Sequence, residues 1–246
     1  MDAPITNSLT AVFLYALLTA LATGLGAVPF AFGSFSKRWL GVANALAAGL
    51  MIAASISLVI EGSQRSGGGT LLGVLLGGAF IAVSHRFLSG RDVSWGDLGQ
   101  ADAMKVLLML GVMTLHSFTE GVGVGVSFGG GEELGVYITA AIAVHNIPEG
   151  LAISLVMIPR GTSVWKAGLW SIFSSLPQPL MAVPAFLLVA WFQPFLAPGL
   201  GFAAGAMLWM VASELLPEAY KDASKVAVTA TLALAMAAMF AFQAFL

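Results

Sequence analysis

Two short stretches near the middle of the chain carry the residues best suited to chemistry, HSFTEG beginning at His116 and HNIPEG beginning at His145. In each, a histidine precedes a glutamate by four residues, which pairs His116 with Glu120 and His145 with Glu149. Residues four apart share one face of a helix, so each pair can act on the same ligand. Together with the amide oxygen of Asn146, these imidazoles and carboxylates suit first-row divalent metals such as zinc, iron(II) and manganese.

Both pairs lie inside long apolar runs. A charged side chain at the centre of a membrane helix costs roughly 2.5–3.5 kcal/mol on insertion scales. Two acids and two histidines at that depth therefore require compensation, which a divalent cation supplies directly. The four side chains could complete one site or divide between two adjacent ions. Two interpretations without a metal stay open, a structural hydrogen bond between helices and a proton relay.

The composition of the chain is that of a membrane protein. Of its 246 residues, 59% are hydrophobic and only 9% are charged, and the mean hydropathy is +0.94. Soluble domains carry about 25% charged residues. Backbone polar groups in lipid must bond within their own element, and the alternation of barrel strands is missing, so the sequence predicts an all-α integral membrane protein. The net charge of −2 gives no electrostatic footprint for nucleic acid, and without cysteine there are no thiolate ligands.

A window of roughly 20 apolar residues predicts eight transmembrane helices. Nine of the ten basic residues then fall on one side of the membrane, and only Arg65 falls on the other. Basic residues concentrate on the cytoplasmic side. We therefore expect a multi-pass protein of the cell or inner membrane with both termini on the non-cytoplasmic side. The predicted spans are 8–33, 40–61, 69–89, 103–127, 134–158, 164–190, 199–217 and 224–245.

Two motifs recur along the chain. AVPF at 27–30 returns as AVPAF at 182–186, and AAGLM at 47–51 returns as AAGAM at 203–207. The first and second spans thus resemble the sixth and seventh. Each second copy comes five spans after the first, an odd number, so the copies point in opposite directions. This predicts the inverted repeat of secondary transporters, spans 1–3 and 6–8 around a central pair, spans 4–5.

At HSFTEG and HNIPEG the chain resembles the ZIP (Zrt/Irt-like protein) family of divalent metal transporters, and the resemblance covers nearly its whole length. HNxPEG is a specific signature of that family. The resemblance implies one ZIP-type transporter domain over residues 1–246. It also implies a binuclear metal centre in spans four and five, and metal movement toward the cytoplasm. The implied metal-binding residues are His116, Glu120, His145, Asn146 and Glu149, with Ser117 also facing the centre.

The resemblance further implies that spans one, four, five and six form a bundle that moves against spans two, three, seven and eight, within a homodimer. The chain departs from the family pattern in two places. Many members have a glutamate in span six, where SSLPQPLMAVP has Gln178, and a neutral amide weakens the second metal position. Many also have a histidine-rich loop between spans three and four, and the loop SGRDVSWGDLGQAD has no histidine.

We therefore expect a secondary transporter, not an enzyme, that carries a divalent metal ion, zinc first, with iron(II), manganese and cadmium also fitting. The ion is the bound substrate, and no cofactor, nucleotide or nucleic acid is expected. An alternative is an intramembrane zinc-dependent hydrolase that uses the same cluster, although neither motif has the order His-Glu-x-x-His. A metal-free proton channel is a third possibility. The roles of Met51 and Glu214, both inside predicted spans, stay open.

Overall fold

The computed structural model describes residues 3–33, 36–89, 100–191 and 193–245, and within these ranges it consists of helices and short connections without a strand. The prediction of an all-helical protein is therefore confirmed. The loop predicted between spans three and four lies almost entirely outside the described residues.

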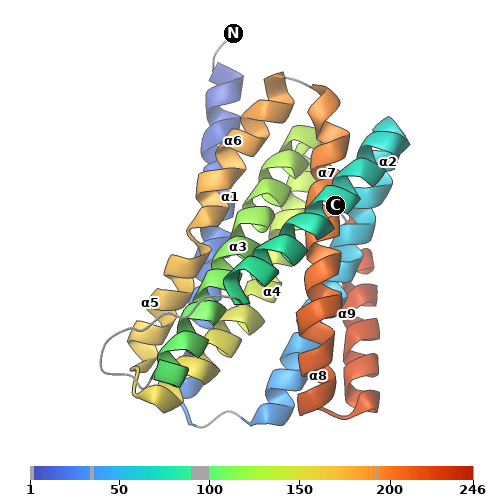
Figure 1. Cartoon of the computed structure of the whole chain (residues 1–246). Coiled ribbons are helices and arrows are strands. Elements are labelled where there is room, and N and C mark those ends of the chain that lie inside the picture. Colours follow the sequence, from blue (N-terminus) through green and yellow to red (C-terminus); the bar gives the residue numbers. More distant parts are fainter. Residues whose placement is uncertain (1–2, 34–35, 90–99, 192, 246) are drawn as a thin grey trace.

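Nine α-helices make up the described parts of the chain (Figure 1). A π-helical turn, Val211–Leu215, joins α7 to α8 without a break. Short 3-10 turns follow α1, α4 and α6. The helices are α1 (Ala3–Leu25), α2 (Lys37–Ser89), α3 (Gln100–Gly130), α4 (Glu132–Met157), α5 (Val164–Ser175), α6 (Pro177–Trp191), α7 (Leu196–Met210), α8 (Leu216–Asp222) and α9 (Lys225–Phe245).

The 53 residues of α2 form two arms that meet at Ser66, whose φ of −159° and ψ of 100° are not helical. The hydroxyl of Thr70 donates to the carbonyl of Ser66 at 2.9 Å, and Ser66 Oγ accepts from the amide of Gly69 at 3.1 Å, so the second arm restarts at once. Figure 1 shows the two arms diverging from this turn. The arms coincide with the predicted spans 40–61 and 69–89.

By length and composition, six stretches within the described residues can cross a membrane. The second contains both arms of α2, and α3 is not among the six. The chain is thus a multi-pass membrane protein, whereas the count of eight spans and the inverted repeat stay predictions. The six stretches are Leu9–Ala31, Arg38–Ser84, Glu132–Ser154, Val164–Trp191, Gln193–Asp222 and Lys225–Ala244.

The helices pack in two groups. One contains α1, α3, α4, α5 and α6, and the other contains α2, α7, α8 and α9. The groups meet where α3 packs on α7 and α2 packs on α4 (Figure 1). This grouping agrees with the two bundles that the family resemblance implies. Large apolar side chains are exposed on the outside of both groups, including Leu18, Leu75, Trp165 and Leu234, as expected of surfaces that face lipid.

Close contact between α3 and α6 depends on two glycines of α3. A Cβ atom at Gly121 would clash with the backbone of Gln178, and one at Gly125 would clash with the carbonyl oxygen of Ala182. Small residues four apart let membrane helices approach until their backbones touch. This contact places α6, and with it Gln178, directly against the polar part of α3.

The α3–α6 contact can be tested by the thermal stability of a variant with a larger residue at the contact. We expect Gly125→Ala to lower the melting temperature of the purified protein by roughly 3–10 °C, because the added methyl group must displace backbone atoms of α6. Gly123→Ala is the matched control on the same helix. Its Cβ atom would lie 3.2 Å from Ala203 Cβ, which a small shift accommodates. Equal melting temperatures for both variants would show that α3 and α6 do not pack as described.

Candidate metal centre

Two facing helices supply all but one of the predicted metal-binding residues. α3 carries His116, Ser117 and Glu120, and α4 carries His145, Asn146 and Glu149. The two helices pack against each other, and all six side chains are at most 5% exposed. The sequence is thus correct in placing these polar groups together, deep inside an apolar bundle.

The first pair of ligand-type side chains is His145 and Glu120. His145 Nε2 lies 2.8 Å from Glu120 Oε1, and its Nδ1 lies 3.2 Å from the carbonyl oxygen of Ala141 on its own helix. A histidine that binds a metal through Nε2 commonly donates its Nδ1–H to such a carbonyl, which fixes the tautomer and the ring orientation. The position of His145 therefore suits an ion that approaches between Nε2 and the carboxylate of Glu120.

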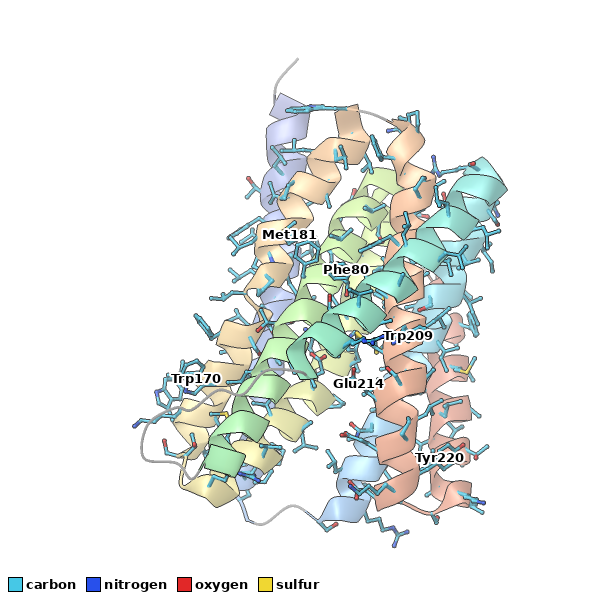
Figure 2. The ribbon with its side chains drawn as sticks, in the orientation of Figure 1. Phe80, Trp170, Met181, Trp209, Glu214 and Tyr220 are labelled. Atoms are coloured by element: carbon cyan, nitrogen blue, oxygen red, sulfur yellow. The ribbon has the colours of Figure 1, made fainter. Side chains whose placement is uncertain are left out.

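The second pair is His116 and Glu149, joined by Glu214 from the π-helical turn. His116 Nδ1 lies 3.9 Å from Glu149 Oε1, and His116 Nε2 lies 3.5 Å from Glu214 Oε1. Figure 2 shows Glu214 reaching from the α7–α8 segment toward α3. Buried His116 Nε2 and Glu149 Oε2 make no hydrogen bond. Buried polar atoms rarely lack a partner, so these two are available to a ligand such as a cation.

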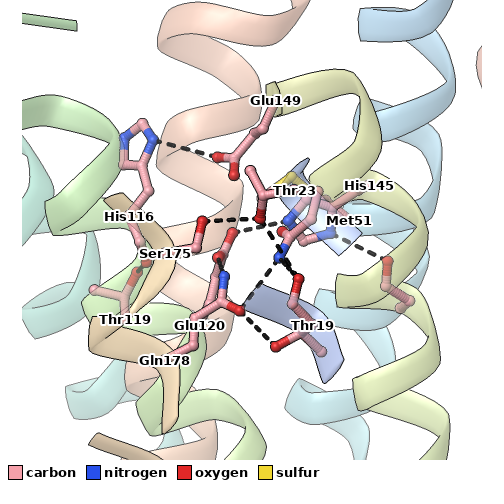
Figure 3. Close-up of polar contacts among 12 residues, drawn as sticks. Thr19, Thr23, Met51, His116, Thr119, Glu120, His145, Glu149, Ser175 and Gln178 are labelled. Carbon is pink, nitrogen blue, oxygen red and sulfur yellow. Dashed lines mark hydrogen bonds and ion pairs between the residues drawn. The ribbon is translucent and has the colours of Figure 1, made fainter. Parts of the chain in front are cut away.

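Gln178 enters the centre from the first turn of α6, which begins after a break at Leu176. Its Nε2 donates to Glu120 Oε2, and its Oε1 accepts from Asn146 Nδ2 at 3.2 Å and from the hydroxyl of Thr19 on α1. Asn146 Nδ2 also donates to the carbonyl oxygen of Thr19 at 2.8 Å. Figure 3 shows this network beside the pair formed by His116 and Glu149.

The carboxylates of the centre interact with one another. Glu149 is subject to the charges of both Glu120 and Glu214. Ionised carboxylates this close repel each other, and a divalent cation between them would reverse the sign of the interaction. Within the described residues, no three histidine, aspartate or glutamate side chains stand close enough to hold one ion as they are placed. The centre consists of two pairs, and binding would require side chains to turn toward a common point.

Sequence reasoning missed the contribution of α1. Thr19 and Thr23 are both buried, and Thr23 Oγ1 lies 2.8 Å from Ser175 Oγ at the end of α5. Two threonines four apart in a largely apolar span lie on one helix face, which is the signal that could have found them. The sequence alone leaves the role of Glu214 open, and the structure places this residue beside His116. Met51 is 1% exposed and belongs to the main apolar core.

Comparison with known proteins places the chain among zinc transporters. A family model described as "ZIP Zinc transporter" matches residues 92–245. The zinc transporter GufA of Myxococcus xanthus is 34% identical, and the match covers 83% of this chain and 87% of the relative. The zinc transporter ZIPB of Bordetella bronchiseptica is 32% identical over 89% of this chain and 75% of the relative. An Arabidopsis thaliana protein named "Putative zinc transporter" is 51% identical over 94% of this chain, which spans only 38% of that relative.

Proposed function

The chain belongs to the ZIP zinc transporter family, and from this premise we propose that it carries zinc across the membrane into the cytoplasm through the buried centre of α3 and α4. Its relatives are named as transporters and not as enzymes, and they give the hydrolase alternative no support. Divalent metal transport is therefore the general function. The choice of ion, the direction and the ligands are the parts that we propose.

The proposed ligands of the ion are His116, Glu120, His145 and Glu149. The observation that carries this assignment is the pair of buried atoms without a hydrogen bond, His116 Nε2 and Glu149 Oε2, on the same two helices as the pair formed by His145 and Glu120. Two imidazoles and two carboxylates also give a ligand set of the kind that zinc accepts. Ser117 Oγ and Asn146 Oδ1 are likewise buried without a hydrogen bond, which supports their predicted place at the centre.

We propose eight crossings of the membrane, with the two arms of α2 as separate spans, α3 as the fourth, and the α5–α6 and α7–α8 segments as the sixth and seventh. The start of α2, the α4–α5 link and the α8–α9 link carry basic residues. In Figure 1 they lie at one end of the bundle, opposite the turn of α2. An even number of crossings and a cytoplasmic basic end leave both termini on the non-cytoplasmic side.

The proposed cycle begins when the ion loses water at the non-cytoplasmic side and exchanges its remaining water for the side chains of the centre. The two groups of helices then move against each other and open the centre to the cytoplasm. One group contains α1 and α3 to α6, and the other contains α2 and α7 to α9. Glu214 supports this account because it belongs to the second group and contacts His116 of the first. We propose that Glu214 receives the ion as it leaves, since a π-helical turn often marks a functional site.

The ion is substrate in this account, and the protein needs no separate cofactor. Zinc is the first choice because the relatives are named for it, while iron(II), manganese and cadmium fit the same nitrogen and oxygen ligands. We propose that residues 1–246 form one transporter domain that works in the bilayer as a homodimer. Neither nucleotide nor nucleic acid takes part.

Uptake of metal into liposomes tests this function. The purified protein is reconstituted in vesicles that contain a metal-sensitive dye, and zinc, manganese, iron(II) and cadmium are offered outside in turn. We expect protein-dependent uptake that is fastest for zinc. Proton flux in the absence of metal would favour the proton channel, and metal binding without uptake of any ion would favour the hydrolase. Either result would overturn the proposed function.

A further inference from the structure

Gln178 is a fully buried side chain in which every polar group has a partner. Its amide nitrogen donates to Glu120 Oε2, and its amide oxygen accepts from Asn146 and Thr19. The orientation of the amide follows from its neighbours, because a carboxylate can only accept and the side-chain nitrogen of Asn146 can only donate. These contacts join α6 to α3, α4 and α1 in one network around Glu120.

The amide group of Gln178 can do for Glu120 what a second cation would do. Glu120 Oε2 is buried and requires a positively polarised partner, which the amide N–H supplies. A carboxylate at position 178 would place two negatively charged oxygens next to each other at this point. A cation between the two carboxylates would remove their repulsion. With glutamine, both oxygens of Glu120 have a partner and Glu120 is the only charged side chain among Gln178, Asn146, Thr19 and Glu120.

The charges of the centre also favour one bound ion over two. Glu120 and Glu149 together neutralise one divalent ion, whereas two ions would leave a net charge of about +2 within a nearly solvent-free part of the bundle. Uncompensated charge at this depth is strongly unfavourable. Glu214, the third acid, would offset only half of that excess.

We propose that the Gln178 carboxamide takes the place of a second metal ion, so that the centre binds one divalent ion per chain. Gln178 is then a positioning residue: it holds Glu120 Oε2 and leaves Oε1, which lies beside His145, to the transported ion. This inference rests on the proposed function and adds the number of ions that the centre carries.

The number of bound ions tests the inference. The protein in detergent is dialysed to equilibrium against zinc, and metal and protein are both quantified, with calorimetry for the affinity. We expect one zinc ion per chain in the wild-type protein and two in Gln178→Glu. For Gln178→Ala we expect one ion with roughly tenfold weaker binding, the size of a lost outer-shell contact. A loss of packing alone would not raise the number of bound ions. The count in Gln178→Glu therefore distinguishes a role of Gln178 in positioning Glu120 from a merely structural role.

Two ions on the wild-type chain, or one ion on a folded Gln178→Glu variant, would overturn the inference. The wild-type count requires no substitution and therefore decides the matter even if a variant fails to fold. Zinc uptake is measured on the same preparations. Two bound ions with normal uptake would refute this inference and leave the proposed function intact, whereas absence of both binding and uptake would refute both.

Discussion

His145→Ala is expected to reduce zinc uptake into proteoliposomes at least ~100-fold while leaving the protein folded. The imidazole is 1% exposed, its Nδ1 faces the carbonyl of Ala141, and its Nε2 faces Glu120, so the ring is held in place with one nitrogen toward another proposed ligand. Loss of an outer-shell partner of a metal site already costs 10–100-fold, and loss of a ligand should cost more. Alanine also leaves no group that could replace the imidazole nitrogen.

His85→Ala is the control for this experiment. The chain has three histidines, and His85 lies near the end of α2, outside the set of proposed ligands. We expect uptake by this variant to match the wild type. Elution volume and melting temperature of both variants establish that they are folded. Wild-type uptake by a folded His145→Ala variant would remove this histidine from the centre.

Glu149→Gln is expected to weaken zinc binding roughly a thousandfold. The substitution keeps the shape of the side chain and removes one negative charge. A pair of unit charges about 4 Å apart interacts by about 4 kcal/mol at the effective dielectric constant of proteins, and each 1.4 kcal/mol is a factor of ten in affinity. Glu149 Oε2 is buried without a hydrogen bond, so this oxygen of the carboxylate is available to an ion.

Calorimetric titration with zinc measures this effect directly. Glu133→Gln is the matched control, since the same change is made on the same helix, at an exposed position in its first turn. We expect the control to bind as the wild type does. Equal affinities for both variants would mean that Glu149 does not contact the ion, and the centre would have to be sought among the other carboxylates.

The sequence predicts the helices and the two His–Glu pairs because both depend on local patterns. Apolar runs of membrane length indicate spans, and a spacing of four places His116 with Glu120 on one helix face. The pairing across helices was not predictable in this way. His145 Nε2 lies 2.8 Å from Glu120 and His116 Nδ1 lies 3.9 Å from Glu149, because α3 and α4 pack side by side and the partners come from different helices.

The surroundings of Gln178 depend on packing that no short pattern reveals. The predicted span 164–190 is divided by a break at Leu176, and Gln178 follows this break. Its partner Thr19 is 159 residues away in sequence, and the contact forms only because α1 and α6 pack together. The π-helical turn that carries Glu214 is equally hidden, since it continues α7 into α8 without a break.

X-ray absorption at the zinc edge, measured on the loaded protein in detergent, tests the central claim most directly. We expect nitrogen and oxygen neighbours at about 2.0–2.2 Å, together with outer-shell scattering from two imidazoles that falls to one in His145→Ala. This result would place the ion between the histidines and glutamates of α3 and α4. A spectrum of oxygen neighbours without imidazole scattering would place the bound ion elsewhere and contradict the proposed centre.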